Sequence, residues 1–224
     1  MGVSVGSSIY NAPSIYESGA GGGGGGLQPG EIVIGEQVLQ TAQINDQIWT
    51  TKNFDTILPG INYNTGGDFP VGSHCWFYNR DSATYGIYGE NRGLLYTASC
   101  LSIIQTYIDD ILPGWRIPTK DDWQKLINFS GGSTFDSLYK LGAPRLWDDT
   151  SNFTNELNLS IIPTGRRKSK NYSDLNLGFY WSSSQHTSAS IACAVFGDTS
   201  NPANANGHQS INYDACAVRF VKDA

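Results

Sequence analysis

The stretch Gly114–Trp123, read GWRIPTKDDW, marks a change from extended chain to helix. Pro118 cannot lie inside a helix and favours extended backbone at the residue before it, so a strand or loop ends here. Thr119 has the hydroxyl of an N-cap, and Asp122, three residues later, can return the hydrogen bond as in a capping box. The stretch therefore predicts a helix that begins at Thr119, with acidic charge at its positive end.

Two helices are predicted from hydrophobic spacing. After the cap, apolar residues recur at helical spacing and predict a helix from Thr119 to about Phe129, with Trp123 on its apolar face. An earlier helix is predicted from Leu94 to Ile108, because its apolar residues also fall on one face. No third segment shows a strong helical pattern.

Short apolar segments elsewhere predict strands, and the polar segments between them predict loops. The strand candidates are EIVIG (31–35), QVLQTAQI (37–44), QIWTTKNF (47–54), LNLSIIPTG (157–165), FYWSSS (179–184), SIACAVF (190–196) and ACAVRFVKD (215–223). The polar loops are predicted at 166–176 and 197–214, and the second is longer than a hairpin needs.

Six blocks of the chain resemble one family, in the same order along the sequence. GWRIPTKDDWQKL resembles the signature G-W-R-[LI]-P-T-x-x-[ED]-W-x-x-L of the Fibrobacter succinogenes major paralogous domain. The other blocks are Gln47–Asn53, Gly93–Tyr96, Pro163–Arg166, Gly178–Ser183 and Val218–Asp223. The resemblance covers about residues 31–224. The family is related to the formylglycine-generating-enzyme branch of the C-type-lectin-like fold.

The resemblance implies an α+β, C-type-lectin-like domain in which two helices flank a small, twisted antiparallel sheet. Four aromatic residues anchor separate family blocks, and we expect them to meet in one core; they are Trp115, Trp123, Trp181 and Phe220. Arg116 and Arg219 lie inside apolar blocks, so we expect each to form a buried ion pair.

The bulk composition excludes several classes of partner. The chain has 224 residues and a formal net charge of −6, which disfavours nucleic acid and acidic membrane surfaces. No apolar run approaches the ~18 residues of a transmembrane helix, so no membrane insertion is expected. The N-terminus has no basic segment followed by an apolar one, so no secretory signal is expected.

Residues 1–30 do not resemble a folded domain. Six glycines at 21–26 are typical of a flexible linker, and a disordered tail is one interpretation. The other is an extended arm, because an Ile-Tyr pair occurs twice, as Ile9 with Tyr10 and Ile15 with Tyr16. Under this second interpretation, residues 1–26 anchor the chain to other proteins of a virion, in a homo-oligomer expected to be a trimer. Residues 31–224 then form the C-type-lectin-like domain.

Catalysis and metal binding have little support in the sequence. The three histidines share no spacing with a carboxylate or nucleophile that would form a triad. The four cysteines, at 75, 100, 193 and 216, lack the close pair that formylglycine-generating enzymes use. We expect buried free thiols, although a Cys193–Cys216 disulfide is geometrically conceivable. The calcium motifs of lectins are matched only in part, by Trp147–Asp149 and Ser200–Ala203. Neither a metal nor another cofactor is therefore expected.

Polar side chains near the C-terminus predict a recognition surface, with a merely soluble loop as the alternative. The candidate ligand-binding residues are Asn171, Tyr172, Gln185, His186, Asn201, Asn204, Asn206, His208, Asn212 and Tyr213. A basic segment from Arg166 to Lys170 is interpreted as a solvated loop or, alternatively, as a contact for an anionic glycan or acidic partner.

These observations favour a non-enzymatic binding protein over an enzyme. We expect a structural protein of a bacteriophage particle, either a fibre or a decoration protein, whose lectin-like head recognises a glycan or protein of the host surface. The alternative is a bacterial cell-surface or secreted adhesin of the same family. An enzyme related to the formylglycine-generating enzymes is a third and weaker alternative.

Overall fold

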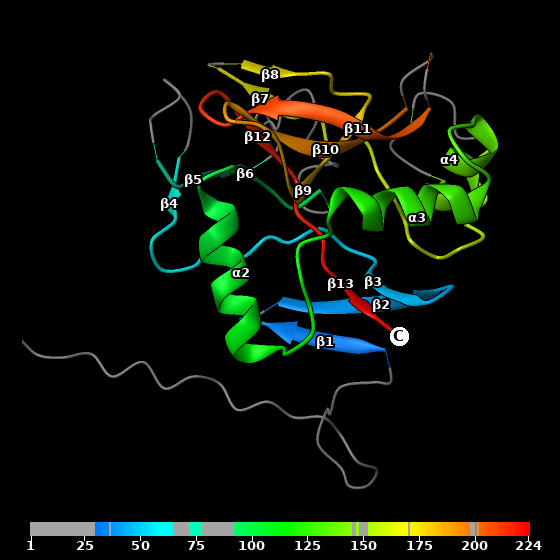
Figure 1. The fold of residues 1–224 in the computed structure, drawn as a ribbon, viewed down its shortest axis with the longest axis horizontal. Coiled ribbons are helices and arrows are strands. Elements are labelled where there is room, and N and C mark those ends of the chain that lie inside the picture. Colours follow the sequence, from blue (N-terminus) through cyan, green and yellow to red (C-terminus); the bar gives the residue numbers. More distant parts are fainter. Residues whose placement is uncertain are drawn as a thin grey trace, which may run out of the picture.

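The structure is a computed structural model that describes residues 30–35, 37–64, 72–77, 92–144, 147, 152–169, 171–197, 200 and 202–224. Its strands and helices are mixed along the chain, so the α+β class is confirmed (Figure 1). The expected arm, with Ile9, Tyr10, Ile15 and Tyr16, lies outside the described residues.

The strands form three sheets. The first has the order β1 (Glu31–Ile34), β2 (Gln37–Ile44), β3 (Gln47–Thr50) and β13 (Val221–Asp223). The second has the order β11 (Ala203–Ser210), β10 (Ser190–Phe196) and β9 (Gly178–Thr187). The third has the order β4 (Asn62–Tyr63), β5 (His74–Phe77), β6 (Leu94–Thr97), β12 (Asp214–Cys216), β7 (Arg166–Lys168) and β8 (Asn171–Ser173). Strands β4 and β5 are parallel, and the other neighbouring strands of these sheets are antiparallel.

The expectation of one small antiparallel sheet is therefore wrong. The predicted strand 215–223 divides into β12 and β13, which belong to different sheets. Between them, the carbonyl of Ala217 accepts from Trp181 N–H of β9 at 2.9 Å, and that of Phe220 accepts from Thr50 N–H of β3 at 3.0 Å. The last segment of the chain therefore joins all three sheets, because its peptide groups bond in turn to each of them.

Two helices were expected, and three are found among the described residues: α2 (Cys100–Ile111), α3 (Lys120–Ser130) and α4 (Phe135–Leu141). The helix predicted from Leu94 instead begins at Cys100, and residues 94–97 form β6. All four residues of β6 are buried, so the strand lacks the alternation that distinguishes it from a helix. Helix α4 has only seven residues, too few for a clear period.

The predicted strand 157–165 is also wrong. Its residues make only isolated bridges, between Ile161 and Gly142 and between Gly165 and Gly178. Two of its residues depart from strand geometry: Asn158 and Ser160 have positive φ angles of 55° and 57°, and Ser160 N–H donates to Asn155 Oδ1 at 2.8 Å. The apolar side chains of this segment still pack in the core, which is why the hydrophobic pattern resembles a strand.

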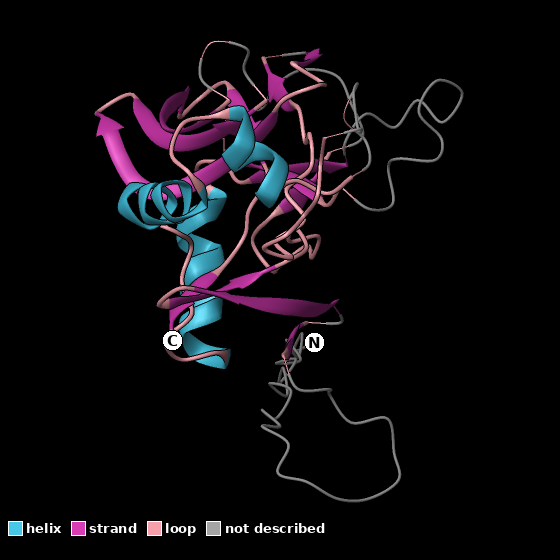
Figure 2. Ribbon diagram, turned by 90° about the vertical axis from the view of Figure 1, so that its right-hand side faces the viewer, coloured by secondary structure: helices cyan, strands magenta, loops and turns pink. Residues whose placement is uncertain are grey.

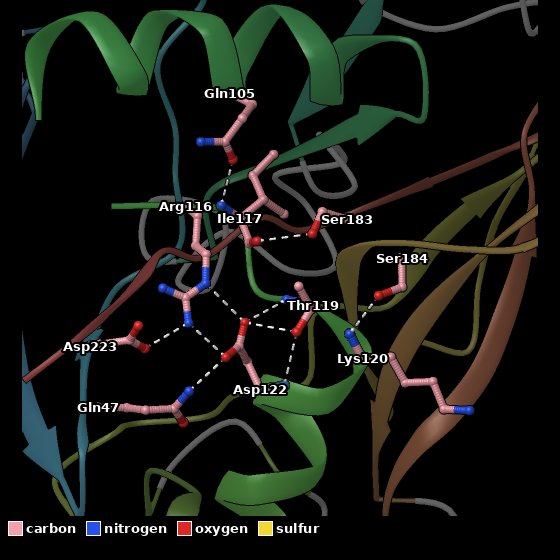
Figure 3. Close-up of polar contacts among 10 residues, drawn as sticks. All are labelled: Gln47, Gln105, Arg116, Ile117, Thr119, Lys120, Asp122, Ser183, Ser184 and Asp223. Carbon is pink, nitrogen blue, oxygen red and sulfur yellow. Dashed lines mark hydrogen bonds and ion pairs between the residues drawn. The ribbon is translucent and has the colours of Figure 1, made fainter. Parts of the chain in front are cut away.

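The predicted capping box at the start of α3 is confirmed (Figure 3). Asp122 N–H donates to Thr119 Oγ1 at 3.0 Å, and Thr119 N–H donates to the Asp122 carboxylate at 2.8 Å. The same carboxylate accepts from Arg116 at 2.8 Å and from Gln47 of β3 at 2.7 Å. Arg116 also pairs with Asp223 of β13 at 2.8 Å, so its predicted ion pair is present, at a half-buried site.

The expected ion pair of Arg219 is wrong, although the residue is buried. Its guanidinium donates to Asn53 Oδ1 at 2.7 Å and to the carbonyls of Leu159 and Ser160 at 2.5 and 2.8 Å. It also lies over the Tyr180 ring, 5.4 Å from its centroid. These neutral acceptors hold the residues before β7 against the chain that follows β3. Burial lowers the pKa of Arg219.

The four aromatic anchors are buried, but they occupy two cores. Trp115, Trp181 and Phe220 lie in a core shared with α2, whereas Trp123 lies in a second core between α3 and the β9–β10–β11 sheet. Helix α2 runs vertically in Figures 1 and 2, and α3 crosses Figure 1 and is seen end-on in Figure 2. The single-core prediction fails because neighbouring residues of β9, Tyr180 and Trp181, face opposite sides of their sheet.

Replacing Trp123 by Ala should lower the free energy of unfolding by about 3–5 kcal/mol, because a large cavity would remain. The indole packs 4.7 Å from the Trp49 ring centroid and 5.6 Å from that of Tyr180, and its N–H donates to the Trp181 carbonyl at 3.2 Å. Urea unfolding measures the change. Phe129→Ala, at a half-exposed aromatic of the same helix, is the matched control and should shift stability by at most about 0.5 kcal/mol. Equal effects would refute the assigned packing.

Replacing Asp122 by Asn should lower the free energy of unfolding at pH 7 by about 2–4 kcal/mol, since the Arg116 pair and part of the cap are lost. Burial raises the pKa of Asp122, but hydrogen bonds from Arg116 and Thr119 outweigh burial and hold it below the ordinary value. A lowered folded pKa means that the stabilisation is present above the unfolded pKa of about 3.9 and is lost as the pH falls through the folded pKa. The difference between wild type and Asp122→Asn should therefore shrink below about pH 4. A difference that stays constant down to pH 2 would contradict this role.

Candidate functional site

Both polar segments that predict loops contain strands, so those predictions are wrong. Residues 166–176 form the β7–β8 hairpin, and residues 203–210 form β11. In β11, alanines on one side are buried in the second core while Asn206 is exposed. A Cβ at Gly207 would come within 2.5 Å of Val195 Cγ2, so only glycine fits there. Alanine, asparagine and glycine have low strand propensity, and the pairing of β11 with β10 outweighs that low propensity.

Three turns lie together at one end of the molecule, at the upper left of Figure 1. The turn after β7 contains Ser169, whose N–H donates to the Tyr213 carbonyl at 2.6 Å. The β11–β12 turn is tied in the same way to the β9–β10 turn, because Ile211 N–H donates to the Ala189 carbonyl at 3.1 Å. We call this site the turn cluster, comprising residues Ser169, Ser188, Ala189, Ile211, Asn212 and Tyr213.

Five of the predicted ligand-binding residues lie in the turn cluster or within a few residues of it along the chain. Asn212 and Tyr213 belong to it and are exposed, with 58 % of Tyr213 accessible. Asn171 begins β8 beside the first turn, and Gln185 and His186 lie in β9 shortly before the second; all three are exposed. These side chains offer hydrogen-bond donors and acceptors around one exposed aromatic ring, which suits recognition of a polar ligand.

The other predicted residues are not at the turn cluster. Asn204 and Asn206 lie in the first half of β11, and six residues of strand, about 20 Å, separate Asn204 from the end of β11 at Ser210, where the turn begins. Asn204 is half-buried, and its Oδ1 accepts from Asn206 N–H at 2.7 Å. His208 pairs with Ala192 along the backbone, but its side chain is outside the described part, as is the whole of Asn201.

The predicted basic loop begins as strand β7, and of its described basic residues only Lys168 is exposed. Arg167 is buried, and its guanidinium lies 5.2 Å from the ring centroid of Tyr172, which is half-buried and thus less available to a ligand than predicted. Burial raises the pKa of Tyr172, against the opposing effect of Arg167. Lys168 is exposed, and Lys170 lies outside the described residues.

Arg166 is a positioning residue that the sequence interpretation missed. It donates to Asp174 at 2.6 Å and to Gln209 of β11, and it lies 4.7 Å from the Phe179 ring centroid. Burial raises the pKa of Asp174, but hydrogen bonds from Arg166 and Ser173 outweigh it and leave the pKa below its ordinary value. The sequence contained a signal for this ion pair. Arg166 and Asp174 are each four residues from residue 170, so a hairpin that turns there would bring them together.

The four cysteines have the chemistry of core side chains. All four cysteines are buried free thiols, and burial raises the pKa of Cys75 and Cys193 to about 12 and that of Cys100 to about 11. Such thiols stay protonated at neutral pH and are poor nucleophiles. Within the described ranges, no group of three or more His, Cys, Asp or Glu side chains could hold a metal ion. None of the described helices combines the length and apolar character needed to span a membrane.

Comparison with known proteins places the chain in a family. No curated protein and no solved structure matches it. Residues 42–222 match the family model described as the Fibrobacter succinogenes major domain. The matched region contains the Asp122 capping box, the buried Arg219 and the turn cluster. The chain therefore belongs to the Fibrobacter succinogenes major domain family.

Proposed function

We propose that this chain is a non-enzymatic recognition protein of a bacteriophage particle, a fibre or decoration protein whose head binds a glycan or protein of the host surface. The turn cluster is the observation that supports this function. It presents Asn212 and the exposed ring of Tyr213 on the β11–β12 turn, which is hydrogen-bonded to the β7–β8 and β9–β10 turns. Binding residues are commonly placed on loops that a rigid scaffold positions.

The arrangement of the head supports display at one end. Strands β1 and β13, near the two ends of the described domain, lie in one sheet at the bottom of Figure 1, and the turn cluster lies at the top. An anchor attached before β1 would therefore leave the turn cluster pointing away from the particle. We assign the domain to the C-type-lectin-like fold on the family resemblance, with the helices packed on strands from both chain ends.

The chemistry of the turn cluster suits a selective contact of modest affinity. Asn171, Asn212 and Tyr213 can bond and stack without the cost of burying a charge. Several heads on one particle would raise the overall affinity without any new contact. We expect a homotrimer held by the arms, with residues 1–26 bound to other virion proteins. A bacterial surface adhesin would use the same turn cluster and would differ only in being anchored to a bacterial cell instead of a virion.

Replacing Asn212 and Tyr213 together by Ala should reduce binding of the purified chain to host cells by about tenfold or more, because truncation of a central aromatic contact commonly costs over 1.4 kcal/mol. Flow cytometry with labelled protein on a panel of bacterial strains measures the change. The matched control is Asn204→Ala with Asn206→Ala, in the first half of β11, which should bind like wild type.

The opposite pattern, with only this control variant losing binding, would move the recognition site to the first half of β11. Equal binding by all three proteins would contradict the assignment of the site to the turn cluster. Binding to no strain would leave a purely structural decoration protein as the better assignment. Circular dichroism of each variant separates loss of binding from loss of folding.

Deleting residues 2–20 should leave a folded head that no longer joins the particle, because the arm's apolar side chains supply its anchor. The measurement is incorporation into particles produced from a phage genome carrying the deletion, with the head detected by antibody. Incorporation at the wild-type level would contradict the anchoring role. Attachment of the intact chain to bacterial cell envelopes instead of particles would favour the adhesin.

A further inference from the structure

Asn206 is followed by Gly207, and this is the only Asn-Gly pair among the 224 residues. Asn-Gly pairs are chemically labile, because glycine has no side chain to shield its backbone nitrogen from the preceding asparagine. The pair lies in the middle of β11, and Asn206 is exposed to solvent. Neither residue belongs to the turn cluster, so the proposed recognition role uses neither of them.

The backbone of β11 is irregular at this pair. The ladder with β10 shifts register at Ala205 and Asn206, which together lie opposite one residue of β10 in a β-bulge. A bulge disrupts the ladder locally and leaves its extra residue unpaired. The N–H of Asn206 donates instead to a side chain of its own strand, Asn204 Oδ1, at 2.7 Å. Asn206 is therefore outside the regular pairing that holds the rest of β11.

The fold fixes the second residue of the pair as glycine. A Cβ at Gly207 would lie 2.5 Å from Val195 Cγ2 and 2.9 Å from Cys193 Sγ. Contacts this short cannot be accommodated unless the closely packed core moves, so the position cannot carry a side chain. The packing of β11 on β10 therefore keeps a chemically labile pair at the surface.

We infer that Asn206 is a site of spontaneous deamidation in the folded protein. The backbone nitrogen of Gly207 loses its proton to solvent base and attacks Cγ of Asn206. The side-chain NH₂ group takes up a proton and leaves as ammonia, which gives a cyclic succinimide. Water then opens the ring at either carbonyl carbon, so the product is aspartate or, with the main chain rerouted through Cβ, isoaspartate. Because the reaction needs only water and no ligand, it goes beyond the recognition role proposed above.

The isoaspartate product would weaken the support of the turn cluster. It inserts an extra carbon into the main chain of β11, which displaces the rest of this strand relative to β10. Gln209, after the insertion, accepts from Arg166 and donates to Cys193 Sγ at 3.5 Å. Ile211 N–H, further along, donates to the Ala189 carbonyl at 3.1 Å. These bonds hold the β11–β12 turn, so displacement of the strand would loosen it.

The test measures deamidation in the full-length protein, kept in mildly alkaline buffer made with water enriched in heavy oxygen, so that each product carries the label. Chymotrypsin and mass spectrometry then give the label at Asn206 and at three internal controls, Asn201, Asn204 and Asn212. The controls are followed by proline, alanine and tyrosine. We expect Asn206 to be labelled at least about tenfold faster than each control, because only glycine leaves the next backbone nitrogen unshielded.

The same chain unfolded in urea shows whether the strand protects the pair. Labelling of Asn206 in urea without labelling in the folded protein would overturn the inference. Equal labelling of all four asparagines in the folded protein would also overturn it. Replacing Asn206 by Gln should abolish labelling at this position, because the longer side chain closes its ring much more slowly.

The effect on the turn cluster is measured by amide hydrogen exchange at Ile211. We expect about tenfold faster exchange in the isoaspartate form than in wild type, the effect of losing roughly one hydrogen bond. Asn206→Asp carries the same charge on an unaltered main chain and should exchange like wild type. Unchanged exchange in the isoaspartate form would refute the loosening of the turn. Host-cell binding is not measured in these experiments, so their failure is distinguishable from failure of the recognition role.

Discussion

The structure depends on the buried carboxylate of Asp122. It closes the capping box with Thr119, and it accepts from Arg116 and from Gln47 of β3. A buried carboxylate is unfavourable without partners, and each of these partners belongs to a different part of the fold. Helix α3 can therefore begin only where the first sheet and the preceding turn supply the donors. This requirement places the helix beneath the second sheet.

The position of α3 also determines how the turn cluster is supported. Trp123 packs against the aromatic side chains of β9 and β10, so the second sheet is held from below. From above, Arg166 joins the β7–β8 hairpin to Gln209 of β11. The turns of the turn cluster then need only their own backbone bonds to stay together. A scaffold fixed in this way can carry variable polar side chains at its tips without changing its core.

Three arginines of this protein position chain segments. Arg166, Arg167 and Arg219 all turn inward, and Arg219 is satisfied by neutral acceptors. The turn cluster presents amides, hydroxyl groups and one tyrosine ring, with the exposed Lys168 beside Ser169. The proposed recognition role would use mainly hydrogen bonds and stacking at these side chains.

The sequence by itself determined the features that rest on neighbouring residues. Thr119, three residues before Asp122, predicted the cap of α3, and the first three strands followed from local patterns, while the α+β class followed from the family resemblance. Only the tertiary structure decided the rest. The sequence of buried β6 predicts a helix, and the polar sequence of β11 predicts a loop. Both segments form strands because pairing with neighbouring strands outweighs their weak local preference. The turn cluster depends on hydrogen bonds between residues far apart in the chain, and no local pattern records which turns will meet.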